Sequence, residues 1–133
     1  MANENNKIRS FRDLNIWKDT INLVKFIYEI TKTFPSSEIY GLTSQIRRAA
    51  VSVPSNIAEG HIRKHTAEFR HFLYIALGSL AELETQIVIT KELGYVDKDT
   101  GEQLIGKIEV IGKQIRSLIS KLTPNPQPPT TKQ

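Results

Sequence analysis

At 133 residues, with 39% apolar and 24% charged residues, the chain has the size and composition of one globular domain, because a chain of this length buries roughly two thirds of its unfolded surface around a single core. Its 18 lysines and arginines against 14 aspartates and glutamates give a net charge of +4, which permits contact with a polyanion without requiring it. The absence of cysteine excludes a disulfide framework, a thiolate metal site and a cysteine nucleophile.

Both ends of the chain are polar. Residues 1–10 lack the apolar core of a signal peptide, and residues 123–133 contain four prolines, which exclude a helix. No run approaches the roughly 18 uninterrupted apolar residues typical of a membrane span. We therefore predict two flexible tails around a folded region at residues 11–122, in a cytoplasmic protein that does not contact a membrane.

The first predicted helix spans residues 13–33, with Asp13 as its N-cap, and ends before Pro35. It carries an apolar stripe on each of two opposite sides. One stripe contains Leu14, Trp17, Ile21, Val24 and Tyr28, and the other contains Ile16, Leu23, Phe26, Ile27 and Ile30. A helix of a monomeric bundle usually hides one stripe, so the second needs a larger core than this chain provides or a neighbouring subunit. We predict that Ile16, Leu23, Ile27 and Ile30 form an interface between copies.

Three further amphipathic helices are predicted at residues 37–60, 66–93 and 98–122. Ser36 or Ser37 can cap the first of them, Thr66 the second, and Asp97 or Asp99 the third. Pro54 predicts a kink or a short break near residues 52–55. Because the connections are short, successive helices must run antiparallel. The sequence thus predicts an all-α, up-down-up-down four-helix bundle.

The residues that carry catalysis in helical bundles are sparse. A carboxylate-bridged di-metal site needs two Glu-x-x-His motifs, and only Glu68 to His71 forms one. His61 and His65 share a helix face that a surface zinc ion could use, although solvated histidines are the simpler interpretation. The seven glycines are scattered singly, so no phosphate-binding loop exists, and no hydrolase motif appears. We predict no enzyme activity, no metal and no cofactor.

Two groups of basic residues are candidates for a nucleic-acid surface. Lys18, Lys25 and Lys32 recur every seven residues, so they form a row that either tracks phosphates or is an ordinary solvated helix face. Arg63, Lys64 and Arg70 surround the predicted turn at residues 61–65, together with the three histidines. Protonation of these histidines at acid pH would strengthen polyanion binding there.

Arg47 and Arg48 lie within a mostly apolar helix, where an unpaired guanidinium is costly to bury. Two interpretations stay open. Glu59, Glu82 or Glu84 can pair with them inside the bundle or across a subunit boundary, or the arginines can bind nucleic acid, because their planar donors suit carboxylates and phosphates alike.

Four segments carry a family resemblance: residues 11–17 (FRDLNIW), 34–60 (FPSSEIYGLTSQIRRAAVSVPSNIAEG), 76–86 (ALGSLAELETQ) and 93–95 (LGY). The sequence from residue 11 to about residue 122 resembles the four-helix-bundle family of ribosomal-RNA intervening-sequence proteins. The resemblance implies a bacterial protein encoded within insertions in 23S ribosomal RNA genes or elsewhere, and a ring-like homopentamer whose molecular role is not established. It extends to the accessory variability proteins of diversity-generating retroelements, which are similar in fold and assembly and bind nucleic acid and a reverse transcriptase through a basic surface.

That related group directs attention to Arg47, Arg48 and Arg63, which lie in or beside the shared motifs, whereas Lys18, Lys25, Lys64 and Arg70 are candidates by charge alone. The first hypothesis for function is a homo-oligomeric RNA- or DNA-binding accessory protein, in which modest charges add up around the assembly. The alternative is a protein-interaction scaffold whose arginines are structural.

Overall fold

The computed structural model describes residues 8–124, so the larger part of each predicted tail, residues 1–7 and 125–133, lies outside the described residues. Within residues 8–124 the chain forms helices and no strand, which confirms the all-α fold. The elements are η1 (Phe11–Asp13), α2 (Asn15–Thr31), η2 (Ser36–Glu38), α3 (Leu42–Ile62), α4 (Thr66–Glu92) and α5 (Lys98–Leu122).

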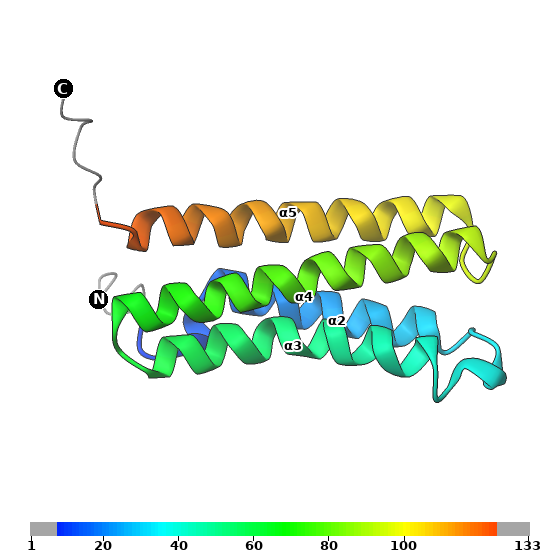
Figure 1. Cartoon of the computed structure of the whole chain (residues 1–133), viewed down its shortest axis with the longest axis horizontal. Coiled ribbons are helices and arrows are strands. Elements are labelled where there is room, and N and C mark those ends of the chain that lie inside the picture. Colours follow the sequence, from blue (N-terminus) through cyan, green and yellow to red (C-terminus); the bar gives the residue numbers. More distant parts are fainter. Residues whose placement is uncertain (1–7, 125–133) are drawn as a thin grey trace, which may run out of the picture.

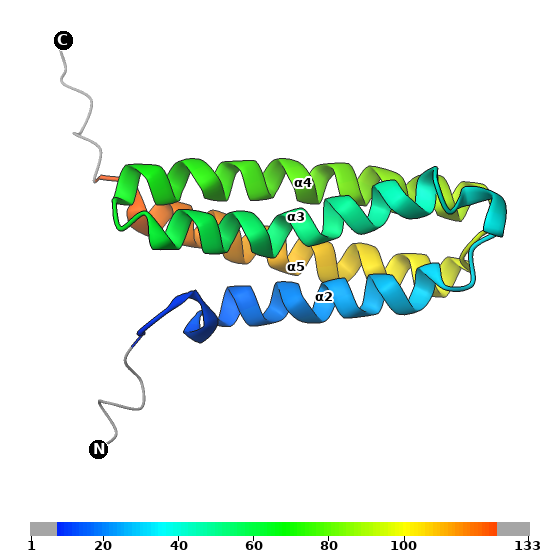
Figure 2. The same cartoon turned by 90° about the horizontal axis from the view of Figure 1, so that it is seen from below.

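The four long helices form an elongated bundle in which the chain reverses direction at each connection (Figures 1 and 2). Each helix contacts two neighbours: α3 packs on α2 and α4, and α5 packs on α4 and α2. Within residues 8–124 no Cα atoms of the diagonal pairs, α2 with α4 and α3 with α5, lie within 8 Å of each other. The seam between α2 and α3 therefore lies on the opposite side of the bundle from the seam between α4 and α5.

The core is built from aliphatic side chains at helical spacing on all four helices. Ile27, Ile46, Leu83 and Ile115 are each fully buried. Small residues let α3 and α4 approach each other, since Ala49, Ala50, Ala76 and Gly60 are buried on these two helices. The result is one continuous core that all four helices share.

The interface between copies that the sequence predicts on the first helix is wrong, because its residues pack inside a single chain. Ile16, Leu23 and Ile27 lie in the core of a single chain, and Ile30 is partly buried against it. The reason is that α2 packs on both α3 and α5, and a helix that contacts two neighbours needs a wider apolar arc than one stripe. These four residues therefore give no support to an interface between copies.

Three predicted helix N-caps are also corrected. Asp13 belongs to η1, where its carboxylate accepts hydrogen bonds from the backbone N–H groups of Arg9 and Ser10, and Leu14 precedes α2 instead. His65, not Thr66, is the N-cap position of α4. Residues 36–38 form η2, and α3 begins only at Leu42. At α5 the cap is Asp97, one of the two residues expected there, because its side chain accepts the Thr100 N–H at 2.7 Å.

Helix α3 continues through Pro54 without a break. Beside the proline, the Asn56 amide donates to the Ser52 carbonyl at 2.8 Å, and the Ser52 hydroxyl lies 2.8 Å from that of Ser79 on α4. The Ser52–Ser79 bond attaches α3 to α4, and the Asn56 bond lies within α3, close to the position where proline removes a helical hydrogen bond. A short break here is excluded, and a kink stays a prediction.

Two helical glycines differ in the space around them. A Cβ on Gly60 would lie 2.7 Å from the Phe72 Cβ and 3.0 Å from the Phe69 ring, whereas nothing lies within 4 Å of a Cβ on Gly106. We expect Gly60→Ala to lower the free energy of unfolding by about 1–2 kcal/mol through overpacking. Gly106→Ala should raise it by up to about 1 kcal/mol, because alanine is the better helix former. Urea denaturation measures both, and a loss of stability at Gly106 would contradict the open environment described here.

Glu38 caps α3 from outside the helix. Its carboxylate accepts the Leu42 N–H at 3.1 Å and the Tyr95 hydroxyl at 2.8 Å. Both bonds favour the ionised form, so the pKa of Glu38 is lowered from its ordinary value of 4.5, first by the Leu42 N–H and then by Tyr95. Ionised Glu38 therefore stabilises the fold above pH 4.5, and this contribution is lost as the pH falls through the lowered pKa.

We expect Tyr95→Phe to move the pKa of Glu38 up towards its ordinary value, without reaching it, because the Leu42 N–H bond remains. The pKa is followed by NMR titration of the Glu38 carboxyl carbon. Tyr40→Phe is the matched control, since Tyr40 is 96% exposed. An unchanged pKa in Tyr95→Phe would show that the Tyr95 bond is not formed in solution.

Candidate interaction surfaces

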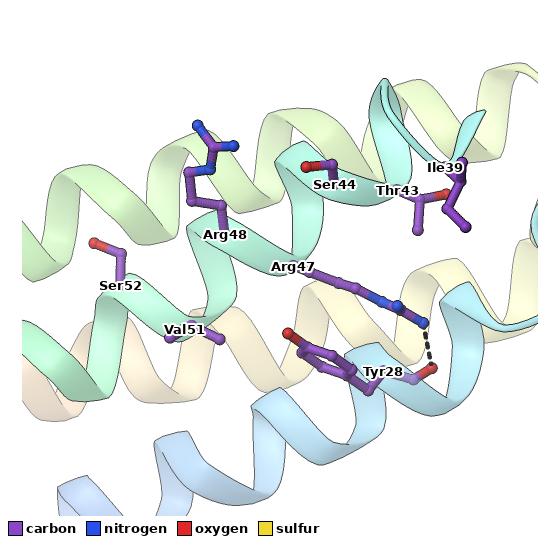
Figure 3. A pocket seen from close by; sticks show the side chains of 8 residues that line it. All are labelled: Tyr28, Ile39, Thr43, Ser44, Arg47, Arg48, Val51 and Ser52. Carbon is purple, nitrogen blue, oxygen red and sulfur yellow. Dashed lines mark hydrogen bonds between the residues drawn. The ribbon is translucent and has the colours of Figure 1, made fainter.

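Arg47 reaches from α3 across to α2 (Figure 3). Its Nε donates to the Thr31 hydroxyl at 2.8 Å, a terminal nitrogen donates to the Tyr28 carbonyl at 3.3 Å, and the guanidinium lies 4.4 Å from the centre of the Tyr28 ring. Thr31 in turn donates to the Ile27 carbonyl at 2.8 Å. A guanidinium held by two hydrogen bonds and a stacked ring binds α3 to α2, which is a structural role.

Arg48, the next residue, is exposed and points away from α2 (Figure 3). It lies beside a surface hollow of about 560 Å³ over the α2–α3 seam, which we call the cationic groove. The groove is lined by Tyr28, Ile39, Thr43, Ser44, Arg47, Arg48, Val51 and Ser52. No carboxylate is among these residues, so the charge of Arg48 is available to a partner.

None of the carboxylates that the sequence offered to Arg47 and Arg48 pairs with them in residues 8–124. Glu59 instead binds Arg63, at 2.8 Å between Oε2 and a terminal nitrogen. Arg63 also lies 3.7 Å from Glu68 and stacks over Phe72. It therefore ties the end of α3 to the start of α4, across the turn at Lys64, whose φ of 60° is left-handed.

Arg70 has a similar internal role. A terminal nitrogen donates at 2.9 Å to the carbonyl of Leu122, the last residue of α5. The last carbonyls of a helix have no partner within it, so this bond satisfies one of them and holds α5 to α4. Lys64, His65 and His71 remain exposed around the same turn.

Lys18 and Lys25 are exposed on the outer side of α2, while Lys32 pairs with Glu29 at 3.0 Å. The charges of the bundle are unevenly divided along its length. The half that contains the α3–α4 turn (residues 8–22, 53–79 and 111–124) has nine lysines and arginines, four carboxylates and all three histidines. The other half (residues 23–52 and 80–110) has seven against nine. We call these the basic half and the acidic half.

Helix α4 is apolar around most of its circumference. Its most apolar 18-residue window has a mean hydropathy of 1.4, yet only 33% of that window is buried by the rest of the chain. By length and composition it is the one helix in residues 8–124 that could cross a membrane, a test that core helices of soluble bundles also pass. Four large apolar side chains on it are exposed: Tyr74, Ile75, Val88 and Ile89.

Two of the three histidines, and Glu68, contact other side chains of the chain. His61 packs edge-on against Phe69, His71 packs against Phe72, and Glu68 faces Arg63. Across residues 8–124 no three histidine or carboxylate side chains come together as a metal site would require.

Comparison with known proteins assigns the family. The family described as 23S rRNA-intervening sequence protein matches residues 12–117. The chain belongs to this family. A crystal structure of a protein of unknown function, from the S23 ribosomal protein family of Bacteroides thetaiotaomicron VPI-5482, has the same fold as this family member, with a TM-score of 0.73 at 22% identity. The alignment covers 78% of this chain and 97% of that one. No curated protein matches significantly.

Sequence reasoning found the basic residues of this 23S rRNA-intervening sequence family member but not their partners. Thr31, Tyr28 and the Leu122 carbonyl hold arginines from other helices. The exposed side of α4 was also missed, although the sequence carries a signal for it: Tyr74, Gly78, Ala81 and Val88 are apolar or small at positions opposite the core stripe of Leu73, Ala76 and Leu80.

Proposed function

We propose that this protein is a non-enzymatic helical scaffold of the cytoplasm that works as a homo-oligomer. The observation that supports this proposal is α4, whose apolar window is only one third buried by its own chain. Monomeric soluble proteins rarely leave a large contiguous apolar patch in water, and a second copy is the partner that every such chain has at hand. Five copies are expected from the family resemblance.

The contacts of Arg47, Arg63 and Arg70 within the chain favour a scaffold over direct phosphate binding by these three residues. Arg47, Arg63 and Arg70 each hold two helices of one chain together through Thr31, Glu68 and the Leu122 carbonyl. A guanidinium that has these partners would have to lose them before it could bind a phosphate. Of the motif arginines proposed from the sequence, Arg48 is the one that makes no side-chain hydrogen bond or ion pair within residues 8–124.

The test of self-association is the mass in solution, measured by light scattering. We expect a multiple of the 15.1 kDa chain mass. Val88→Glu, which places a charge on the outer side of α4, should lower that mass. Ile62→Glu is the matched control. Ile62, like Val88, is an exposed branched aliphatic residue, but it lies at the end of α3. A wild-type mass of 15.1 kDa would overturn the proposal.

A second function, binding of RNA or DNA, is favoured by the charge of the basic half, where nine cations face four carboxylates. Several copies side by side would add these charges into one polyanion-binding surface. Lys18, Lys64 and Lys121 are exposed there and free of ion pairs within residues 8–124.

This second function is tested with labelled RNA and DNA at several salt concentrations. We expect binding that weakens steeply with salt, and a log–log salt slope reduced by about 2 in the Lys64→Ala, Lys121→Ala double variant. Lys98→Ala, in the acidic half, is the control and should bind like the wild type. No binding at low salt would exclude this function and leave the scaffold.

A further inference from the structure

We infer that a hollow between α2 and α5 binds an ω-amino acid, a linear aliphatic molecule with an ammonium group at one end and a carboxylate at the other. The hollow has a volume of about 740 Å³, which lies within the range typical of small-molecule sites. All of its lining belongs to one chain, so the site does not depend on the proposed self-association.

One end of the hollow offers two acceptors for an ammonium group. The side-chain Nε2 of Gln114 donates to Asp19 Oδ2 at 3.0 Å, and Asp19 forms no ion pair within residues 8–124. Because a carboxylate accepts hydrogen bonds, this contact fixes which end of the Gln114 amide is nitrogen. The other end, Oε1, is buried and has no hydrogen-bond partner within residues 8–124. A buried acceptor without a donor is costly, and an ammonium group beside Asp19 would serve both acceptors.

The opposite end of the hollow carries a positive charge. Lys107 lies there, with its Nζ 5.3 Å from the centre of the Phe26 ring. Lys107 precedes Gln114 by seven residues on α5. Phe26 likewise follows Asp19 by seven residues on α2. Seven residues make about two helical turns, so the two charges lie roughly 10 Å apart along the seam. The other polar side chains of the lining are neutral amides, those of Asn22 and Gln103.

The middle of the hollow is apolar and open. Leu23 and Ile111 are buried residues that contribute to the lining, and the exposed Val110 lies beside them. Gly106 also lines the hollow, and nothing lies within 4 Å of a Cβ at this position. A glycine inside a helix is destabilising relative to alanine, and no close approach of another helix requires one here. Gly106 therefore leaves room for an aliphatic chain between the two charged ends.

The order of these groups along the seam defines the ligand. Its ammonium group binds Asp19 and Gln114, its aliphatic chain covers the apolar middle, and its carboxylate faces Lys107. Five methylene groups between the two charges span roughly 7–8 Å when extended, and a hydrogen bond of about 2.8 Å at one end completes the distance. A diamine would instead place its second ammonium group against Lys107, and a dicarboxylate would place an anion against Asp19, so both are disfavoured.

Binding is measured by NMR titration of the ¹⁵N-labelled protein. The probe is 6-aminohexanoate, and hexylamine, hexanoate and hexane-1,6-diamine are the comparisons. We expect 6-aminohexanoate to shift the Gly106 backbone amide and the Gln114 side-chain amide. Hexylamine, which lacks the contact with Lys107, should bind about tenfold more weakly, as the loss of one charge-assisted hydrogen bond implies. Hexane-1,6-diamine should bind more weakly than hexylamine, because Lys107 repels its second charge.

Two glycine variants test the position of the site. Gly106→Leu fills the middle of the hollow and should abolish binding, while the helix stays formed because leucine is a better helix former than glycine. Gly78→Leu is the matched control, because nothing lies within 4 Å of a Cβ on Gly78 either, and this residue is on α4, outside the hollow. The control should bind 6-aminohexanoate like the wild type. Circular dichroism checks that both variants are folded.

Two charge variants test the orientation of the ligand. Asp19→Asn should weaken the binding of 6-aminohexanoate and hexylamine by about tenfold or more and should not weaken that of hexanoate. Lys107→Gln should remove the advantage of 6-aminohexanoate over hexylamine and the disadvantage of the diamine. A purely structural role of either residue would change the affinities of all four probes together.

Three results would overturn the site. The first is the absence of shifts at Gly106 and Gln114 at about 10 mM of 6-aminohexanoate, ten times the Kd of roughly 1 mM that marks weak binding. The second is unchanged binding in Gly106→Leu. The third is an equal affinity of the wild type for 6-aminohexanoate and hexane-1,6-diamine. None of these results depends on the mass of the protein in solution, so the proposed scaffold function stands or fails separately.

Discussion

Replacing Ile27 by alanine should lower the free energy of unfolding by about 2–5 kcal/mol, the range found when a buried isoleucine loses three carbons and leaves a cavity. Ile27 is 0% exposed within a single chain, and its carbonyl also accepts the Thr31 hydroxyl that orients Arg47. The loss should be the same at every protein concentration, because the cavity forms inside each copy. Urea denaturation followed by circular dichroism at two concentrations provides the measurement.

The matched control is Val110→Ala, since Val110 is a branched aliphatic residue within α5 that is 57% exposed. The free energy of unfolding of Val110→Ala should differ from that of the wild type by less than about 0.5 kcal/mol, as is usual for surface substitutions. If Ile27→Ala had instead left the isolated chain unaffected and dissociated an oligomer, the sequence-based interface would be restored and the core described here would be wrong.

The two C-terminal helices were predictable in detail, because local signals decide them. The spacing of Leu73, Ala76 and Leu80 defines the buried stripe of α4. The Asp97 cap and the proline at 124 bound α5. These signals depend only on residues within a few positions of each other, which a single sequence contains in full.

The role of the first helix was not predictable from its own residues. Its two apolar stripes are real, and a helical projection displays them correctly. However, the projection does not say how many neighbours the helix has. Because α2 lies against both α3 and α5, it uses Ile16, Leu23 and Ile27 within its own chain. The exposed apolar surface on which the proposed self-association rests lies on α4 instead.

The candidate site shows the same limit. Sequence spacing places Arg47 and Arg48 on different sides of α3, but Thr31 is 16 residues from Arg47, and Leu122 is 52 residues from Arg70. Partners at such separations follow from the packing of helices. The sequence therefore identifies the arginines, but it does not show which guanidinium groups form hydrogen bonds within the chain.

Arg47→Ala and Arg48→Ala should separate the structural arginine from the one available to partners. Removing Arg47 takes away a hydrogen bond to Thr31, another to the Tyr28 carbonyl and the stacked Tyr28 ring. We expect a loss of about 1.5–3 kcal/mol in the free energy of unfolding, the usual value for hydrogen bonds that involve a charged group. Arg48 is exposed, so its removal should change the stability of the isolated chain by less than about 0.5 kcal/mol.

The two variants should also differ in how their stability depends on protein concentration. The destabilisation in Arg47→Ala should be present in dilute and concentrated samples alike, because its partners belong to the same chain. Any effect of Arg48→Ala should appear only as a weaker dependence of the unfolding midpoint on protein concentration, since stability gained by association follows mass action. Equal, concentration-independent losses in both variants would mean that Arg48 also has an internal partner, and its assignment to the cationic groove would then fail.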